Sequence, residues 1–394
     1  MSLRILWSAN APWAPTGYGI QGKYLLPRLR ALGHEVANFA WYGLQGGMMN
    51  LDGMMIYPAV ADMWGTDVVG AHCQHFKADV LISLQDNWVL PANYTERVHP
   101  TLWASWFPVD SDPIPEQVAA ISRTADYPIV YSKFGLAQAR NVGIEATYIP
   151  HGVDTKAFRP LNAQERAEAR TKLGFPQDAF VCIMVAANKG YPSRKSFAEN
   201  IQAFAEFRSR HPNAYLYLHT LATTQHGGVD IQRILHACNL PVECVKIVDQ
   251  YSYVIGLPAD YLTAMYGAAD VLMAASMGEG FGIPIIEAQA CGCPVITTNW
   301  TSMPELTFNG YTTQPVQRWW TPLNTWACVP SIANIIEALE RIYTWGEDER
   351  LDHASFGVQK MCQDYDWDVC VSQYWAPFLE RVERDIRGGN HSDG

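Results

Sequence analysis

The sequence has few charged residues, and most of those are acidic. Charged side chains make up 17% of the 394 residues, and the formal net charge is −11. About a quarter would be usual for a globular protein. A nucleic-acid-binding surface needs an excess of basic side chains, so the composition argues against nucleic acid as a partner. An anionic ligand must then be held by local cations, because the field of the whole chain repels it.

Long apolar runs are also missing. No run of apolar residues reaches the roughly 20 residues of a membrane-spanning helix. The start of the sequence lacks the charged and then apolar region of a signal peptide, and residues 3–7 have the length of a strand. We therefore expect a cytoplasmic protein without a transmembrane segment. Peripheral contact with a membrane and the oligomeric state stay open.

The cysteines lack the spacing of a metal site. Several of the nine stand inside apolar runs, where Cys acts as a small hydrophobe in a reducing compartment. Cys291-Gly-Cys293 has no second pair and no nearby His, so we expect no structural zinc. Asp110-Ser-Asp112 has two carboxylates at the spacing of a D-x-D metal motif, and a divalent cation is the alternative there. We predict that no metal is bound.

Short apolar runs alternate with helical patterns along the whole chain, without an internal repeat. This alternation is typical of α/β proteins with parallel sheets and crossover helices. We predict twelve strands, at residues 3–9, 36–41, 55–57, 80–84, 102–107, 129–131, 147–149, 180–186, 214–218, 244–248, 271–274 and 294–297.

The length of the chain favours two domains, since 394 residues exceed one ordinary core. Phe158-Arg-Pro160 breaks the pattern, and Asn162 with Glu165 forms a capping box for a helix that ends at Gly174. We predict an N-terminal domain at residues 1–160 and a C-terminal domain at residues 161–370. The rest of the chain, from about residue 371 to 394, has the pattern of an amphipathic helix.

The most informative segment runs from Glu279 to Glu287, with the sequence EGFGIPIIE. It follows an apolar run that suits a buried strand, and Pro284 and Gly292 suit the start and the stop of a helix. Unpaired backbone N–H groups at such a helix start form an anion site. We expect them to come from Gly280, Phe281, Gly282 and Ile283.

The two glutamates stand on either side of this anion site. Each carboxylate can accept hydrogen bonds from hydroxyl groups, Glu279 before the helix and Glu287 one turn inside it. A phosphate flanked by two polyols describes a nucleotide sugar. The alternative is that the helix macrodipole alone favours acidic residues near its start.

A second segment, NKGYPSRKS from Asn188 to Ser196, supplies two cations. Ser196 with Glu199 has the pattern of a capping box, so a helix is expected to begin at about residue 197. Arg194 and Lys195 would then lie before a helix N-terminus, where the dipole disfavours cations. A bound diphosphate reverses that penalty, and Arg can bind it through two N–H groups. A solvated loop is the alternative.

Gly17-Tyr18-Gly19-Ile-Gln-Gly22 matches the G-x-G-x-x-G pattern of dinucleotide-binding oxidoreductases. We reject that interpretation, because Asn10 to Thr16 separate the glycines from the preceding strand. No acidic residue stands about twenty positions later to hold a ribose. We predict instead a loop of backbone N–H groups on the acceptor side of a cleft.

Taken together, these segments resemble glycosyltransferase family 4, retaining enzymes of the GT-B fold. Glu279 to Glu287 resembles the family's E-x7-E signature, and Ile149-Pro-His-Gly-Val-Asp154 resembles its interdomain segment. Tyr365-Asp-Trp367 and the helix after it resemble the closing helix. The resemblance covers nearly the whole chain. It implies two Rossmann-like domains facing across a deep cleft, with the C-terminal helix crossing back to complete the N-terminal acceptor domain.

The resemblance also implies roles for single residues. In the C-terminal donor domain, Glu279 would hold hydroxyl groups of the transferred sugar and Glu287 the ribose. The N–H groups of Phe281 and Gly282 and the side chain of Lys195 would meet the phosphates. Where the family often has an Arg this chain has Asn188, so Arg194 is expected to substitute for it.

The catalytic side of the first domain departs from the family. Where the family often has a His, this chain reads Trp106-Phe-Pro-Val-Asp110, and Asp110 is the candidate for that role. His151 and His219 are alternatives, and a structural role explains either of them equally well. The resemblance implies a UDP- or GDP-sugar as co-substrate, no required cofactor, and a glycan, lipid or small-molecule acceptor. The alternatives are a nucleotide-sugar epimerase or phosphorylase of the same fold, and a non-catalytic nucleotide- or glycan-binding protein.

Overall fold

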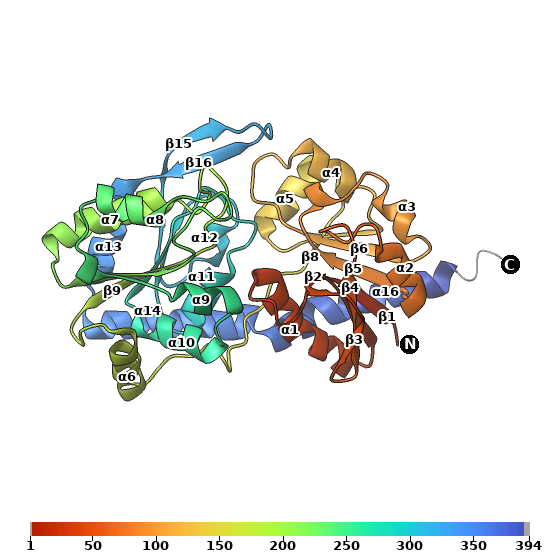
Figure 1. Ribbon diagram of the computed structural model, residues 1–394, viewed down its shortest axis with the longest axis horizontal. Helices are drawn as coiled ribbons and strands as arrows, with labels where there is room; N and C mark the ends of the chain where they lie inside the picture. Colours follow the sequence, from red (N-terminus) through yellow and green to blue (C-terminus); the bar gives the residue numbers. More distant parts are fainter. Residues whose placement is uncertain (1, 390–394) are drawn as a thin grey trace. The chain divides into compact units, whose positions relative to one another are not determined.

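The computed structural model describes residues 2–389, which form two compact units (Figure 1). Within this range the first unit contains the chain up to Val109, Pro113–Gly152 and the segment from Trp367. The second contains Asp110–Asp112 and Val153–Asp366. The division thus follows Gly152, whereas the sequence suggested a boundary near residue 160. Residues 390–394 of the expected closing helix lie outside the described part.

The first unit is built on an eight-stranded sheet with the order β3-β4-β2-β1-β5-β6-β7-β8. All neighbouring strands are parallel except the β3–β4 pair. The strands are β1 (Arg4–Asn10), β2 (Glu35–Gln45), β3 (Met49–Leu51), β4 (Met54–Ala59), β5 (Val80–Leu84), β6 (Leu102–Phe107), β7 (Tyr127–Val130) and β8 (Thr147–Tyr148).

Helices cover this sheet and bury its apolar strands. They are α1 (Gly17–Ala31), α2 (Val69–Phe76), η1 (Asn87–Val89), α3 (Tyr94–Val98), α4 (Glu116–Ser122), α5 (Lys133–Asn141), α15 (Trp367–Cys370), η4 (Val371–Trp375) and α16 (Ala376–Gly389). The C-terminal elements pack on this unit through aromatic side chains. Trp375 lies edge-on to Trp106 with ring centroids 5.1 Å apart, and the Tyr127 hydroxyl bonds Asp385 at 2.9 Å.

The second unit has a six-stranded, fully parallel sheet with the order β11-β10-β9-β12-β13-β14. The strands are β9 (Phe180–Val185), β10 (Ala214–His219), β11 (Val245–Ile247), β12 (Val271–Ala274), β13 (Val295–Thr298) and β14 (Tyr311–Thr313). The helices are α6 (Ala163–Leu173), α7 (Phe197–Arg210), α8 (Ile231–Ala237), η2 (Val242–Cys244), α9 (Gln250–Ile255), α10 (Ala259–Ala268), α11 (Ile283–Ala290), α12 (Met303–Leu306), α13 (Ile332–Tyr343), α14 (Glu347–Lys360) and η3 (Met361–Tyr365).

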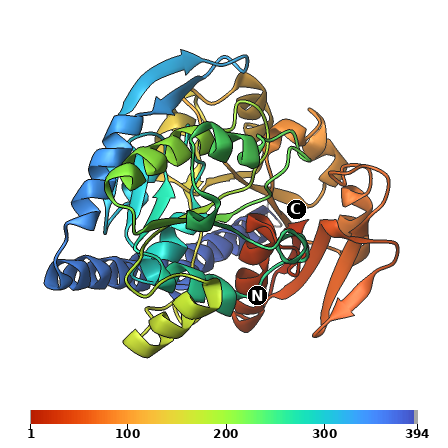
Figure 2. The same cartoon turned by 60° about the vertical axis from the view of Figure 1, so that its left-hand side comes forward.

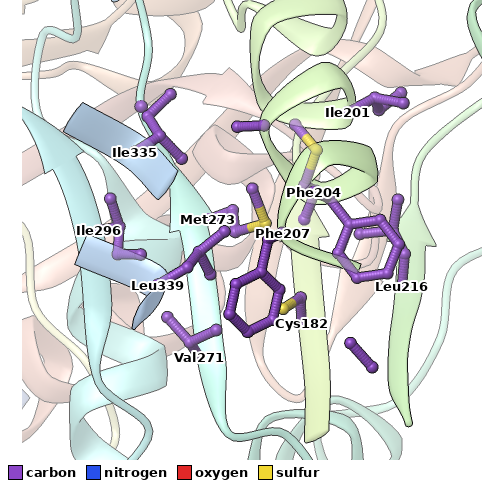
Figure 3. Close-up of a cluster of buried hydrophobic side chains, with 14 of the residues drawn as sticks. Cys182, Ile201, Phe204, Phe207, Leu216, Val271, Met273, Ile296, Ile335 and Leu339 are labelled. Atoms are coloured by element: carbon purple, nitrogen blue, oxygen red, sulfur yellow. The ribbon is translucent and has the colours of Figure 1, made fainter. Parts of the chain in front are cut away.

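The core of the second unit explains why its strands read as continuous apolar runs. Helices α7 and α13 pack against one face of the sheet, and Phe204 and Phe207 of α7 meet Leu339 of α13 in one buried cluster (Figure 3). Strands covered on both faces need apolar side chains at successive positions. The short apolar runs of the sequence therefore predicted the strands of this sheet. Counted over both units, each of the twelve predicted runs overlaps a strand.

Four strands were not predicted, and they are short or exposed. β3 and β14 have three residues each, and the antiparallel pair β15 (Pro315–Trp320) and β16 (Trp326–Pro330) is an exposed hairpin. Figure 2 shows this hairpin, in light blue, apart from the parallel sheet of its unit. Edge and hairpin strands bury few side chains, so they leave no continuous apolar run in the sequence.

The local helix signals were half right. The capping box of Asn162 and Glu165 is confirmed, and α6 ends at Gly174 in the left-handed conformation. The predicted capping box of Ser196 and Glu199 is wrong, although α7 does begin at residue 197 as predicted. Ser196 has φ +50° and its side chain makes no cap hydrogen bond. Its backbone carbonyl instead accepts a hydrogen bond from Asn200 at 2.8 Å.

Candidate functional site

Glu279 lies in the loop that joins β12 to α11, the strand–turn–helix predicted from the sequence. Gly282 precedes the helix with φ +113°, a conformation that disfavours any residue with a Cβ, and Pro284 occupies the first turn. No side chain caps the helix N-terminus within the described residues. Pro284 has no N–H and the Ile285 N–H bonds the Gly282 carbonyl at 2.9 Å, so the candidates for binding an anion are the N–H groups from Gly280 to Ile283.

The two predicted cations meet Glu279 in one ion-pair cluster. The Lys195 Nζ atom lies 2.6 Å from Oε1 and 2.7 Å from Oε2 of Glu279. The Arg194 Nη1 atom lies 3.2 Å from the same carboxylate and also donates to the Gly278 carbonyl. A backbone hydrogen bond of 2.8 Å from Met277 to the Arg194 carbonyl joins the two loops. The structure therefore brings both cations beside the start of α11.

Asp110 completes the charged cluster. Its carboxylate lies 3.6 Å from Arg194 Nη1, and it belongs by its contacts to the second unit. A Cβ added at Gly278 would lie 2.5 Å from the Asp110 carbonyl oxygen, so only glycine permits this approach. The candidate catalytic residue Asp110 and the candidate donor residues Arg194, Lys195 and Glu279 thus form one network.

The charge state of the cluster follows from its surroundings. The residue Glu279 is only 8% exposed, and burial by itself would raise its pKa. Lys195 and Arg194 outweigh burial and hold the pKa at about 2. Burial lowers the pKa of Lys195, and Glu279 opposes that change. The pair is therefore charged at neutral pH and supplies two cations close to one carboxylate.

Two residues that the sequence did not point to, Thr301 and Ser302, hold the backbone of the Glu279 loop by hydrogen bonds. The hydroxyl of Ser302 lies 2.8 Å from the carbonyl oxygens of Glu279 and Phe281, and Thr301 Oγ1 accepts from the Glu279 N–H at 2.9 Å. Ser302 is fully buried, and Thr301 has φ +53°, which is uncommon for a β-branched residue. Hydroxyl residues after a strand carry no distinct spacing, so no pattern pointed to them.

A small cavity adjoins the charged cluster on the side of α11. It has a volume of about 20 Å³, and its lining includes Lys195, Glu279, Gly282 and Ile285. Phe281 is turned away into the core, where its ring lies 6.1 Å from that of Tyr365. The Phe281 side chain therefore anchors the loop, and only its backbone is a candidate for phosphate binding.

Glu287, the second glutamate of the motif, is buried in α11. It is 5% exposed, and its Oε2 accepts a hydrogen bond of 2.9 Å from the Tyr266 hydroxyl. Burial raises the pKa of Glu287 to about 7, although the Tyr266 hydrogen bond opposes this change. The carboxylate thus titrates near neutrality, unlike that of Glu279.

This pKa predicts a pH-dependent stability. Because the folded pKa of about 7 exceeds the ordinary value of 4.5, the protonated carboxyl stabilises the fold below pH 4.5, and the contribution is lost as pH rises through 7. As pH rises from 5 to 8, the free energy of unfolding of Glu287→Gln should increase by roughly 2–3 kcal/mol relative to that of the parent. Urea unfolding at both pH values measures this difference. Glu337→Gln on the exposed side of α13 is the control, and a Glu287→Gln difference that is equal at both pH values contradicts the assignment.

Asn188 is the candidate donor residue that the structure places elsewhere. It is 2% exposed, and its amide N–H groups lie 2.7–3.2 Å from the carbonyls of Leu221, Thr223 and Val229. Its Oδ1 accepts from the Val229 N–H at 2.9 Å. These bonds tie the loop after β10 to the end of β9. Asn188 therefore shapes this loop, and its side-chain amide is already used by backbone groups.

The glycine segment of the first unit is a helix and not the predicted loop. Gly17, Tyr18 and Gly19 form the first turn of α1, capped by Thr16, whose Oγ1 accepts from the Gly19 N–H at 3.1 Å. A Cβ at Gly19 would lie 2.4 Å from the Ala14 carbonyl oxygen. Close packing of α1 on the preceding turn thus explains Gly19. The Tyr18 hydroxyl lies 3.2 Å from Asp86.

His151 is buried in the first unit and is held as a neutral side chain. Its ring lies between Trp106 and Tyr131, with centroids 4.3 and 4.2 Å away. Its Nδ1 lies 2.9 Å from Oε1 of Gln21. Burial lowers the pKa of His151 to about 3. Its aromatic surroundings are those of a structural histidine, the alternative left open from the sequence.

Residues 2–389 contain no cluster of three or more His, Cys, Asp or Glu side chains arranged for a metal ion. In the same range, no helix combines the length and the apolar character needed to cross a bilayer.

Comparison with known proteins identifies the class of the second unit. Residues 165–318 match the family of group 1 glycosyl transferases, a range that contains Lys195, Glu279 and Glu287. D-inositol 3-phosphate glycosyltransferases are similar to part of the chain. That of Corynebacterium jeikeium (strain K411) is 28% identical over 157 residues, which cover 40% of this chain and 36% of that protein. That of Acidothermus cellulolyticus is 31% identical over 150 residues, covering 38% and 32%.

Solved structures extend the similarity in fold to nearly the whole chain. Sucrose-phosphate synthase from Thermosynechococcus elongatus has a TM-score of 0.74 at 18% identity and covers 98% of this chain, with 100% of its own length matched. The Anabaena protein HepE, in complex with UDP and glucose, has a TM-score of 0.72 at 16% identity, with coverage of 96% and 100%. The predicted GT-B fold is confirmed.

Over residues 165–318 the chain matches the group 1 glycosyl transferases, and the resemblance of the sequence to a glycosyltransferase family is confirmed at that level. The matched region spans only about a third of the length of the curated relatives. The substrates and the mechanism of the whole chain therefore stay predictions, and so does the deep cleft between its domains.

Proposed function

We propose that this protein is a retaining glycosyltransferase that moves a sugar from a nucleotide-diphosphate sugar to an acceptor hydroxyl group. The observation that carries the proposal is the cluster of Lys195 and Arg194 on Glu279 at the uncapped N-terminus of α11. Two cations and the backbone N–H groups of a helix start in one place suit a diphosphate.

The donor contacts follow from the positions of these groups. Lys195, Arg194 and the N–H groups from Gly280 to Ile283 bind the two phosphates. Glu279 accepts hydrogen bonds from hydroxyl groups of the transferred sugar, and Glu287 from the ribose. The Anabaena protein HepE was solved with UDP and glucose, which supports a UDP-sugar over a GDP-sugar as the first donor to test.

The chemistry needs no protein nucleophile. As the glycosidic bond to phosphate breaks, negative charge grows on the leaving diphosphate, where the cations and the helix N-terminus stabilise it. The anomeric carbon becomes cation-like, and the Asp110 carboxylate offers the opposing charge. A departing phosphate oxygen accepts the proton of the acceptor hydroxyl on the same face, so the anomeric configuration is retained. Lys195 and Arg194 take the place of a divalent cation, which makes the reaction metal-independent.

A transfer assay tests this function. The protein is incubated with UDP- and GDP-sugars and a panel of acceptors, with and without EDTA, and the products are followed by proton NMR. We expect release of nucleoside diphosphate and a glycoside with the anomeric configuration of the donor, unchanged by EDTA. An inverted product, or loss of turnover in EDTA, contradicts the proposal. So do epimerisation of the donor alone and a requirement for inorganic phosphate.

A further inference from the structure

Three tryptophans of the first unit form a row from the core to the surface. Trp41 in β2 is 8% exposed, and its ring centroid lies 5.4 Å from that of Trp64. Trp64 lies 6.1 Å from Trp88, which is 55% exposed. Trp41 and Trp88 lie near the carboxyl ends of β2 and β5, which is the edge of a parallel sheet where ligands bind.

The outer two tryptophans are held in place by the loops that carry them. The Asp62 carboxylate accepts hydrogen bonds from the N–H of Trp64 at 3.3 Å and of Thr66 at 2.9 Å. A Cβ at Gly65 would lie 2.2 Å from the ring of Phe39, so this turn packs directly on β2. Gln117 donates to the Trp88 carbonyl at 3.1 Å. An exposed but fixed aromatic face is a preorganised binding surface.

Buried polar atoms without a partner lie at the same edge of the sheet. They are Nε1 of Trp41, Oδ1 of Asn10 at the end of β1, and both amide atoms of Gln85 directly after β5. These residues are at most 8% exposed, and the four named atoms find no hydrogen-bond partner among residues 2–389. The strands are neighbours in the order β2-β1-β5, and the pairing of Ser8 with Ser83 places Asn10 beside Gln85.

We propose that this edge of the first unit is a binding site for a neutral saccharide, which is the acceptor of the transfer. The saccharide stacks a pyranose face on Trp88, whose ring lies edge-on to that of Trp64, and its hydroxyl groups bond Gln85, Asn10 and Trp41. Its role as acceptor rests on the proposed function, whereas the binding site itself does not. The inference selects the carbohydrate class from the glycan, lipid and small-molecule acceptors that the sequence left open.

The chemistry of the surface selects this class of ligand. The loops after β4 and β5 carry Asp62, Asp67 and Asp86 and no lysine or arginine, which disfavours an anionic membrane surface or an anionic acceptor. A purely apolar ligand would leave the Gln85 amide unpaired in the interior, which is costly. A pyranose offers both an apolar C–H face and hydroxyl donors and acceptors at its rim. It can therefore stack on an aromatic ring and hydrogen-bond the buried amides at the same time.

Ligand-observed NMR on the intact chain tests the site. The probes are methyl α-glucoside, methyl α-mannoside, methyl β-galactoside, maltose and cellobiose, each with and without UDP. We expect saturation transfer to at least one probe, and roughly tenfold weaker binding in Trp88→Ala, because a stacking contact is lost. Gln85→Leu removes the amide at similar volume and weakens binding to a similar degree. Trp320→Ala, on the exposed hairpin of the second unit, is the matched control and leaves binding unchanged.

Calorimetric titration with UDP and GDP on the same proteins separates this inference from the proposed function. If no probe binds, or if Trp88→Ala binds as the parent does, the inference is overturned while normal nucleotide affinity leaves the proposed function intact. If neither nucleotide binds but a saccharide binds through Trp88, the site stands and its role as acceptor site falls. Preferential binding to phosphatidylglycerol vesicles through Trp88 also overturns the saccharide assignment.

Discussion

Replacing Lys195 with methionine is expected to weaken the binding of UDP or GDP by roughly 10²-fold, the effect of losing a charge-assisted contact in a partly buried site. Lys195 Nζ is held within 2.7 Å of both Glu279 oxygens, and the side chain is 21% exposed. The ammonium group is therefore fixed beside the start of α11. Affinity for the nucleoside without phosphates should not change. Calorimetric titration measures both quantities.

The control for this variant is Lys189→Met. Lys189 is an exposed lysine on the same loop, so it carries the same charge without the Glu279 contact. Thermal unfolding of both variants is needed as well, because Lys195→Met leaves Glu279 with Arg194 as its nearest counter-charge. Equal diphosphate affinities of the parent, Lys189→Met and Lys195→Met would remove Lys195 from the phosphate site.

The second large effect is expected for Glu279→Gln, which should lower the rate of sugar transfer roughly 10³-fold, as losses of electrostatic stabilisation in active sites do. The amide keeps the shape of the side chain but loses the charge that orients Lys195 and Arg194 and accepts the sugar hydroxyls. Affinity for UDP or GDP should be unchanged or tighter, because a carboxylate next to the phosphates is removed. Transfer rates and calorimetric affinities together test this split.

A combined loss of rate and nucleotide affinity would instead mean that Glu279 serves only to build the phosphate site. Glu337→Gln, which changes an exposed glutamate of α13, is the control and should transfer at the parental rate. A Glu279→Gln protein that keeps more than about a tenth of the parental rate would contradict direct contact with the sugar.

The sequence predicted those parts of the fold and site that depend on burial and on chain direction. Buried parallel strands need apolar side chains on both faces, which is why all twelve runs overlap strands. The link from β12 to α11 was predictable because Gly282 needs positive φ and Pro284 suits a first helical turn. Glu279 follows β12 and the loop with Lys195 follows β9. Because these two parallel strands are neighbours, both residues are expected at the same edge of the sheet.

Other parts depend on tertiary contacts that no spacing reveals. Ser196 has the pattern of an N-cap, but Asn200 bonds its carbonyl and the Ala275 carbonyl, and the residue takes a left-handed conformation instead. The glycines of α1 match a phosphate-binding pattern, yet Gly19 is required by the Ala14 carbonyl. Asn188 lies shortly after the end of β9, but its amide is used by neighbouring backbone groups.

The same limit applies to groups that act at a distance in the sequence. Ser302 braces a loop 21–23 positions earlier in the chain, and only the fold shows that contact. The pKa of Glu287 near 7 follows from burial against α10, whereas Glu279 in the same motif is held at about 2 by two cations. The pKa values of the two carboxylates of one motif thus differ because of their surroundings and not because of their spacing in the sequence.

Lys195, Arg194 and the start of α11 are proposed to bind the diphosphate of a nucleotide sugar. Calorimetric titration of the intact protein with uridine, UMP, UDP and UDP-glucose, and with the guanosine series, tests this proposal most directly. For one of the two bases, the account predicts that affinity rises by at least roughly 10² from nucleoside to diphosphate, and that added salt reduces this gain. Equal affinity for nucleoside and diphosphate in both series, or no binding in either, would contradict it.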